Sequence, residues 1–222
     1  MTGKDVLVIV PTRGRPDASV EFHKEFLAKS MISDLMFAID EDDADSYSRI
    51  EGVLYEVNPR MGMNGTLNYV ATKYADKYKY IAFMGDDHRV RTFGWDIVMT
   101  EKIGSLGVAY GNDLIQGQAL PTAVLMSSNI IKAIGYMAPP KQKHMYLDNF
   151  WLDLGTRLNA IHYLEDVIIE HLHFSVGKSD MDSSYQETND SAIYNADKVA
   201  YDEYLSTQMD VDIEKILKCV ND

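Results

Sequence analysis

The amino-acid sequence predicts an α/β protein with a mostly parallel central sheet, helices on both of its faces and a helical segment at the C-terminus. Short apolar runs alternate with helical segments through the first half of the chain, and several of these runs stop abruptly at acidic or turn-forming residues. This alternation is typical of a parallel sheet, because its strands are buried on both faces and form continuous apolar runs.

The first half supplies the regular part of the sheet. Residues 6–10 form a continuous apolar run, which predicts a buried strand. It ends at a turn over residues 11–16, after which Asp17 or Ser19 can cap a helix over residues 20–29. The other elements expected here are strands at 34–39, 52–57 and 80–84, a short helix at 46–50 and a helix at 66–77.

The second half is less regular. Its expected helices cover residues 95–103, 128–134 and 148–158, and its expected strands cover residues 108–110, 122–126 and 167–174. Residues 177–188 are small and polar, which predicts a loop, and residues 195–221 are expected to be helical. Because no repeat or linker interrupts the chain, we expect one domain over residues 1–190 and a helical extension over residues 191–222 that packs on it.

Composition narrows the class of protein. The chain has 222 residues, of which 46% are hydrophobic, and a formal net charge of −13, which disfavours a general binder of polyanions. No apolar run approaches the roughly 18 residues that span a bilayer, and no signal-peptide pattern is present. The single cysteine, Cys219, excludes an internal disulfide, so we expect a cytoplasmic protein. One region holds a cluster of basic residues, which is either a local basic groove or a solvated surface: Lys132, Lys141, Lys143 and His144.

The most informative stretch is the apolar run at residues 80–84, which is followed by Gly85, Asp86 and Asp87. A strand here delivers two carboxylates to its carboxyl end, where ligands bind in open α/β sheets. Adjacent carboxylates repel each other, so a divalent cation or a cationic partner commonly offsets the cost. The alternative is a strand that ends in a solvated acidic turn.

Two strand ends together resemble those of nucleotide-sugar glycosyltransferases with the GT-A fold, which is Rossmann-like. Among these enzymes, the chain is broadly similar to glycosyltransferase family 2. The first strand ends in Pro-Thr-Arg-Gly-Arg-Pro and a later strand ends in paired aspartates, in that order, and the likeness extends over about residues 6–185. The chain also resembles small bacteriophage-encoded glycosyltransferases, including those that decorate modified DNA bases. The resemblance implies a hexosyltransferase-like enzyme that uses Mn²⁺ or Mg²⁺ and transfers a sugar, with inversion, from a nucleoside diphosphate to an acceptor hydroxyl.

The resemblance also implies metal ligands. In the family pattern Asp-x-Asp the last carboxylate binds metal, so Asp87 is assigned to the metal and Asp86 to the ribose or the metal. Gly85 stands where the pattern has its first aspartate, which leaves the division between these two roles open. His171 and His173 lie two residues apart and therefore on one face of their strand. Enzymes of this type often take a further ligand from a late histidine, and His173 at the strand end is preferred; a structural role is the alternative.

Donor-binding candidates follow from the same strand ends. Asp40 closes the second strand, where a carboxylate can accept hydrogen bonds from ribose or base; a solvated acidic loop is the alternative. Arginines after the first strand can pair with phosphate. In resembling enzymes the helix before the metal strand faces the nucleotide, and a later loop closes over the diphosphate. The donor-binding set is Pro11, Thr12, Arg13, Arg15, Asp40, Asn64, Gly65, Asn68, Asp86 and Lys178.

Asp148 is the candidate general base. In resembling enzymes a carboxylate at the start of a helix after the acceptor loop takes the proton of the acceptor hydroxyl. Aromatic neighbours can raise its pKa by desolvation; the alternative is a helix N-cap worth about 1 kcal/mol. Asn112, Asp113 and Trp151 are the candidates for contact with the acceptor or the donor sugar, and an ordinary connecting loop is the alternative for the first two.

Two other functions compete with sugar transfer. A sugar-phosphate nucleotidyltransferase usually carries a Gly-x-Gly-Thr-Arg-x-x-Pro loop after its first strand, which residues 11–16 do not match. A non-catalytic module that binds a nucleotide or carbohydrate would keep the same residues. The acceptor is left open between a modified DNA base, a glycan, a protein and a lipid-linked sugar, and so are the donor sugar, its base and the oligomeric state.

Overall fold

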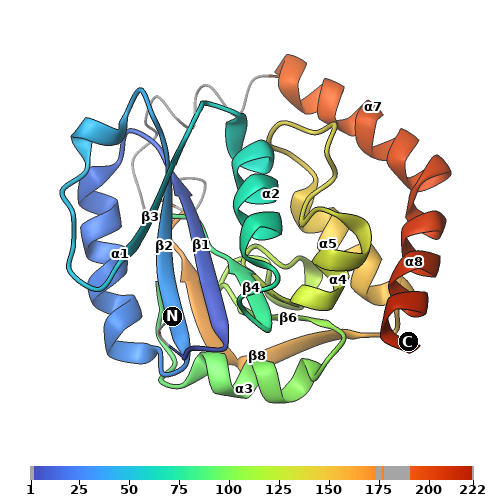
Figure 1. Cartoon of the computed structure of the whole chain (residues 1–222), viewed down its shortest axis with the longest axis horizontal. Coiled ribbons are helices and arrows are strands. Elements are labelled where there is room, and N and C mark those ends of the chain that lie inside the picture. The colour runs from blue at the N-terminus through green and yellow to red at the C-terminus, as the bar shows by residue number, and fades with distance from the viewer. Residues whose placement is uncertain (1–2, 174–176, 178–190, 222) are drawn as a thin grey trace.

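The computed structural model describes residues 3–173, residue 177 and residues 191–221 of the chain. Over these residues an eight-stranded mixed sheet has the order β3-β2-β1-β4-β7-β6-β8-β5 (Figure 1). Its strands are β1 (Val6–Thr12), β2 (Ser33–Asp40), β3 (Leu54–Asn58), β4 (Tyr80–Phe83), β5 (His88–Val90), β6 (Val108–Asn112), β7 (Val124–Ser127) and β8 (Ile161–His171).

The first half of the sheet is parallel, as the sequence predicts. Strand β1 pairs with β2 on one side and with β4 on the other, and β2 pairs with β3. Val6 lies opposite Ser33 and Tyr80, so the two neighbours flank β1 along most of its length. Their carboxyl ends therefore open at one edge of the sheet, which is where ligands bind in open α/β folds.

The second half mixes orientations: β6 and β8 pair in parallel, and the other pairs are antiparallel. Strand β7 pairs antiparallel with both β4 and β6, and β5 pairs antiparallel with β8. Strand β8 begins at Ile161 rather than at residue 167, and the three-residue β5 has no counterpart among the expected strands. Glu165 and Asp166 are exposed within β8, so this part of the strand lacks the apolar run that marks a buried strand.

Helices cover both faces of the sheet and divide the core in two. Alternate residues of β1 enter different cores, with Leu7 and Ile9 on one side and Val6 and Val8 on the other. The first core includes helices α2, α4, α5, α7 and α8, and the second includes α1 and α3. The helices are α1 (Pro16–Lys29), α2 (Gly62–Tyr74), α3 (Trp95–Ile103), α4 (Ser128–Ile134), α5 (Leu147–Arg157), α7 (Ser191–Thr207) and α8 (Met209–Asn221), with short 3₁₀ turns η1 (Ala44–Ser46) and η2 (Gly117–Ala119).

The C-terminal segment forms two helices that run along the side of the first core (Figure 1). Helix α8 packs on α4 and α5. Tyr201 of α7 donates a hydrogen bond to Asp153 of α5, at 2.6 Å, and the buried Asp212 of α8 accepts hydrogen bonds from Tyr136 and Tyr204. No helix among the described residues is both long enough and apolar enough to cross a lipid bilayer.

Candidate active site

A cavity of about 440 Å³ opens at the carboxyl ends of β1, β2 and β4. Its walls are the loop after β1, the turn after β4, the first turn of α2, the end of β8 and the segment 143–148 that leads into α5. This volume lies within the usual range for small-molecule sites. The lining includes eleven residues that the sequence singles out: Pro11, Thr12, Arg13, Arg15, Asp40, Asp86, Asp87, Asp148, Trp151, His171 and His173.

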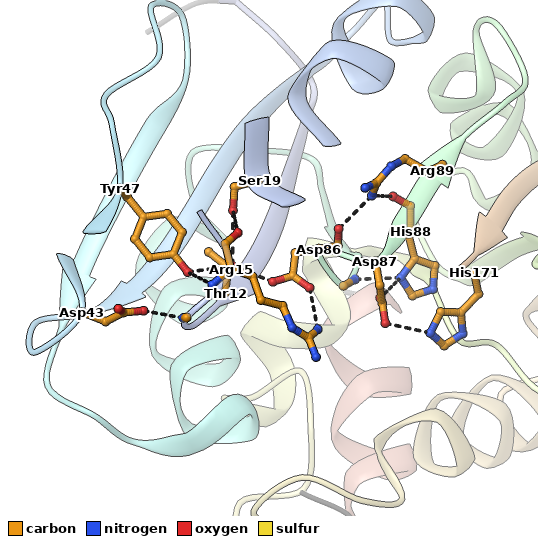
Figure 2. Close-up of polar contacts among 12 residues, drawn as sticks. Thr12, Arg15, Ser19, Asp43, Tyr47, Asp86, Asp87, His88, Arg89 and His171 are labelled. Carbon is orange, nitrogen blue, oxygen red and sulfur yellow. Dashed lines mark hydrogen bonds and ion pairs between the residues drawn. The ribbon is translucent and has the colours of Figure 1, made fainter. Parts of the chain in front are cut away.

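Asp86 faces the loop after β1. Its carboxylate accepts a hydrogen bond from Thr12 Oγ1 at 2.6 Å and pairs with Arg15 Nη1 at 3.0 Å (Figure 2). The residue is only 5% exposed. Burial raises the pKa of the Asp86 carboxyl, and so does the charge of Asp87, while Arg15 and Thr12 act in the opposite direction. Asp86 therefore ties β4 to the loop after β1.

Asp87 faces the end of β8 instead. Its Oδ2 accepts a hydrogen bond from His171 Nε2 at 3.2 Å, and its Oδ1 lies 3.3 Å from His88 Nδ1 (Figure 2). Burial alone would raise the pKa of the Asp87 carboxyl, but contacts with the two histidines outweigh burial and hold this pKa well below its usual value. Asp87 is therefore ionised at neutral pH, as a metal ligand must be.

His88 is a site residue that the sequence does not single out. In the antiparallel pair of β5 and β8 it lies directly opposite His171, and the two rings stack with centroids 4.3 Å apart. Its Nδ1 accepts a hydrogen bond from the Gly85 N–H at 3.0 Å, and burial lowers its pKa, so the ring is neutral. The available signal was its position directly after Asp87.

Gly85 explains why the chain departs from the Asp-x-Asp pattern. A Cβ atom at this position would lie 2.5 Å from Asp87 Oδ1 and 3.1 Å from His88 Nδ1. A side chain at position 85 would therefore displace the Asp87 carboxylate or the His88 ring. The turn is supported from behind by the buried Arg89, whose Nη1 donates to the carbonyl oxygens of Asp86 and His88 at 2.8 and 2.7 Å.

The residues fit a divalent metal ion. Ligand atoms of Asp87, His88 and His171 all lie within 4.8 Å of one another. One carboxylate oxygen and imidazole nitrogens suit Mn²⁺ better than Mg²⁺, which prefers oxygen ligands. While His88 Nδ1 accepts from the Gly85 N–H, its Nε2 carries the ring proton, so Asp87 and His171 are the candidate ligands and His88 lies beside them. His173, which the sequence favours over His171, also lines the cavity, with its ring 5.0 Å from that of His171. His171 contacts Asp87.

The acidic loop after β2 binds the loop after β1. Arg13 pairs with Asp40 at 3.0 Å and with Asp42 at 2.6 Å, and the Gly14 N–H donates to Asp43 at 2.6 Å. Asp40 is 9% exposed, so it differs from the solvated acidic residue that the alternative interpretation requires. Tyr47, which the sequence does not single out, accepts a hydrogen bond from the Arg15 N–H and contacts Thr12 Oγ1 (Figure 2).

The start of α2 presents different residues to the cavity from those expected. Gly62, Met63 and Thr66 line it, whereas Asn64, Gly65 and Asn68 do not. Asn64 is buried. The side-chain amide of Asn68 donates to the Ala138 carbonyl and accepts from the N–H groups of Met137 and Ala138, each at 2.8 Å, so it holds the loop between α4 and α5.

Asp148 lies in the first turn of α5 and lines the cavity. The N-cap residue is Tyr146, with φ 66°, so Asp148 is not the cap. Burial raises the pKa of the Asp148 carboxyl, which matches the desolvation expected from the sequence. Trp151 packs against Phe83 with ring centroids 5.2 Å apart and donates its indole N–H to the Met137 carbonyl at 2.8 Å. It forms part of the cavity floor.

Two further candidates, Asn112 and Asp113, do not line the cavity, and a third, Lys178, lies outside the residues that the structure describes. Asp113 accepts hydrogen bonds from three backbone N–H groups of residues 115–117 and from Thr122, which occupy its carboxylate within its own loop. Asn112 accepts one from the Leu114 N–H.

No protein-family model matches the chain, and no curated protein matches it in sequence. Solved structures do match its fold. A mannosyltransferase from Pyrobaculum calidifontis in complex with GDP-Man and Mn²⁺ aligns over 99% of this chain and 75% of its own, with a TM-score of 0.57 and 10% identity. TarS from S. aureus aligns over 98% of this chain, with a TM-score of 0.59 and 13% identity, and this chain spans 43% of its length.

A third match is glucosyl-3-phosphoglycerate synthase from Mycobacterium tuberculosis in complex with Mn²⁺, uridine diphosphate and phosphoglyceric acid. It aligns over 89% of this chain and 78% of its own, with a TM-score of 0.55 and 10% identity. The chain has the GT-A fold. This finding confirms the expected fold class, and the GT-A sheet places the turn with Asp86 and Asp87 at the carboxyl end of β4, inside the cavity.

Proposed function

We propose that the protein is a metal-dependent glycosyltransferase that moves a sugar from a nucleoside diphosphate to an acceptor hydroxyl with inversion. The observation that carries this proposal is the contact between Asp87 and His171, 3.2 Å apart in a cavity at the carboxyl end of β4. Two proteins of the same fold have Mn²⁺ with a nucleotide or nucleotide sugar in their structures, which supports the same ligands here.

Asp87 and His171 would hold the metal ion, and His88 would support the turn beside it through its bond to Gly85. When bound, the ion neutralises the charge that develops on the leaving diphosphate. Arg15 Nη1 pairs with Asp86 at 3.0 Å, and Arg15 also lines the cavity, so its guanidinium can donate to a phosphate oxygen beside the cluster. Glycosidic bond cleavage requires this neutralisation because the diphosphate leaves with the bonding electron pair.

The nucleoside would lie between the loops after β1 and β2. Asp40 offers a buried carboxylate acceptor, which suits a ribose hydroxyl or a ring N–H of the base. Pro11 and Thr12 end β1 on the same side of the cavity, where their backbone can flank the base. Arg13 pairs with both Asp40 and Asp42, so it can keep Asp42 as a partner when Asp40 accepts from the ligand.

Asp148 would act as the general base. Its carboxylate takes the proton of the acceptor hydroxyl while that oxygen attacks the anomeric carbon and the bond to the diphosphate breaks. A pKa raised by burial makes the carboxylate a stronger base than a solvated one. A single displacement of this kind inverts the anomeric configuration. Trp151, in the next turn of α5, is fully buried, so it supports the cavity floor and does not stack on a sugar ring.

One assay tests the proposal. Purified protein is incubated with a panel of nucleotide sugars, with and without Mn²⁺, and nucleoside diphosphate release is measured. We expect release from one donor that depends on Mn²⁺ and is lost in Asp87→Ala, with the circular dichroism spectrum unchanged. Pyrophosphate release from a nucleoside triphosphate would identify a nucleotidyltransferase instead. Tight binding of a nucleotide sugar without release, across acceptors, would identify a binding module.

A further inference from the structure

The segment 143–145, which forms the cavity wall just before α5, is fixed by a carboxylate from the C-terminal helix α7. Asp197 is 2% exposed and accepts hydrogen bonds from the N–H groups of Lys143, His144 and Met145, at 2.9, 2.9 and 2.8 Å. Three charge-assisted bonds to consecutive amides hold the backbone in one conformation. The backbone of this segment therefore has a defined position beside the cavity.

A second anchor fixes the other end of the same loop. Asn68 on α2 bonds the backbone of Met137 and Ala138 through three contacts of 2.8 Å. The Lys143 carbonyl also accepts from the Asn64 N–H at 3.4 Å. The loop that connects α4 to α5 is thus bound to α2 and to α7, and neither anchor uses the side chain of Lys143.

Lys143 and His144 both line the cavity, yet their side chains have no hydrogen-bond or ion-pair partner among the described residues. The buried acid Asp197 accepts from backbone amides of this segment, and no ion pair joins it to the Lys143 ammonium group among the described residues. The two other lysines of the basic cluster are not available to a ligand in the cavity. Lys141 pairs with Glu203 at 2.8 Å, and Lys132 is exposed on α4 outside the cavity.

The position of these two side chains indicates what they bind. They lie on the segment that also carries Asp148, the proposed base, and His144 is close enough to Asp87 and Arg15 to be influenced by their charges. In a chain of net charge −13, an anionic ligand is repelled at long range and needs local cations. A lysine ammonium group and an imidazole N–H are suitable donors to a phosphate or carboxylate.

We propose that Lys143 and His144 form an anion subsite, and that the acceptor carries a phosphate or carboxylate group near the hydroxyl that receives the sugar. This inference rests on the proposed transferase function, because it assigns the subsite to the acceptor. Lys143 supplies the charge and His144 a hydrogen-bond donor. Asp197 is a positioning residue that fixes the backbone from which both side chains project, without contact with the ligand.

The test compares two small probes that differ by one phosphate. Glycerol 3-phosphate and glycerol are titrated calorimetrically into protein that holds Mn²⁺ and saturating nucleoside diphosphate, so that the diphosphate position is occupied. We expect glycerol 3-phosphate to bind at least about tenfold more tightly than glycerol, because of one charge-assisted contact. Lys143→Gln should remove this preference, and the matched control Lys132→Gln should keep it.

A second pair of variants tests the role of Asp197. Asp197→Asn should weaken binding of glycerol 3-phosphate while the lysine is still present. The control Tyr201→Phe removes the hydrogen bond to Asp153 and so loosens α7 without a direct effect on segment 143–145; it should bind the probe like the wild type. Equal effects of these two variants on probe binding would show that Asp197 acts only through stability.

Three results would overturn the subsite. The wild type could bind the two probes equally, or Lys143→Gln and Lys132→Gln could show the same preference for glycerol 3-phosphate. Weaker binding of the nucleoside diphosphate itself in Lys143→Gln would assign the lysine to the donor. Failure of the transferase proposal gives a different result, because it appears as absent metal-dependent nucleotide release in the separate turnover assay.

Discussion

The carboxylates of Asp86 and Asp87 turn to different partners although the residues are adjacent in the chain (Figure 2). Asp86 bonds Thr12 and Arg15 on the donor side of the cavity, and Asp87 contacts His171 and His88 at the end of β8. The two side chains thus have different roles: Asp86 supports the loop after β1, and Asp87 is available to a metal ion.

We expect these neighbours to give opposite results in a metal titration. Asp87→Asn removes a charged ligand and should weaken Mn²⁺ binding by at least about tenfold. Asp86→Asn should leave Mn²⁺ affinity within about threefold and lower the melting temperature instead, because it leaves Arg15 without its buried partner. Isothermal titration calorimetry with Mn²⁺ and thermal unfolding measure the two effects. A larger loss of affinity in Asp86→Asn would reverse the assignment.

Loss of Arg15 should destabilise the fold in a pH-dependent manner. Arg15→Met leaves the buried Asp86 carboxylate without its cationic partner and should cost about 3 kcal/mol at neutral pH. The folded-state pKa of Asp86 is raised by burial and by the charge of Asp87, and removal of Arg15 raises it further. The penalty is therefore full above this pKa and decreases as the pH falls through it. Urea unfolding at several pH values measures this; a penalty independent of pH would contradict it.

The role of His88 can be separated from that of a simple aromatic ring. His88→Phe keeps the stack on His171 but leaves the Gly85 N–H without its acceptor, and we expect weaker Mn²⁺ binding and a lower melting temperature. His88→Asn offers an amide oxygen to that N–H and should recover part of the stability. If both variants bind Mn²⁺ and melt like the wild type, His88 contributes neither to the turn nor to the metal cluster.

Asp148→Asn should reduce sugar transfer by about 10²- to 10⁴-fold while nucleotide-sugar binding persists. The base acts in its ionised form, so wild-type transfer should fall as the pH drops through the Asp148 pKa, which burial raises above the ordinary carboxyl value. Because the folded-state pKa exceeds the unfolded one, the ionised carboxylate costs stability at neutral pH, and the variant should be at least as stable as the wild type. Unchanged transfer would exclude Asp148 as the base.

Elements with local signals could be predicted closely from the sequence. Helices α3 and α4 match the expected ranges at both ends, because Gly94 and Gly104 bound the first and Gly135 ends the second, each with positive φ. Helix α1 begins at Pro16 rather than at residue 20, since a proline is favoured in the first helical turn. The expected helix at 46–50 is wrong: the 3₁₀ turn η1 ends at Ser46.

The pairing of distant segments could not be predicted in the same way. His88 stands opposite His171 only because β5 and β8 pair, and β5 is too short to show a periodic pattern. Asn68 binds the backbone of a loop that is distant in the sequence, and Asp113 binds the backbone of its own loop. From the sequence alone, both residues resemble ligand contacts. In contrast, Asp87 and Asp148 lie where local patterns place them, at a strand end and a helix start.

The most direct test of the central claim is the position of the metal ion. Crystals are soaked with Mn²⁺ and the nucleotide sugar found in the donor screen, and anomalous scattering is recorded near the manganese edge. We expect one anomalous peak within coordination distance of Asp87 and His171, in contact with the diphosphate. A peak held by Asp86 instead, or no peak in this cavity with the nucleotide bound, would contradict the proposed metal-dependent transfer.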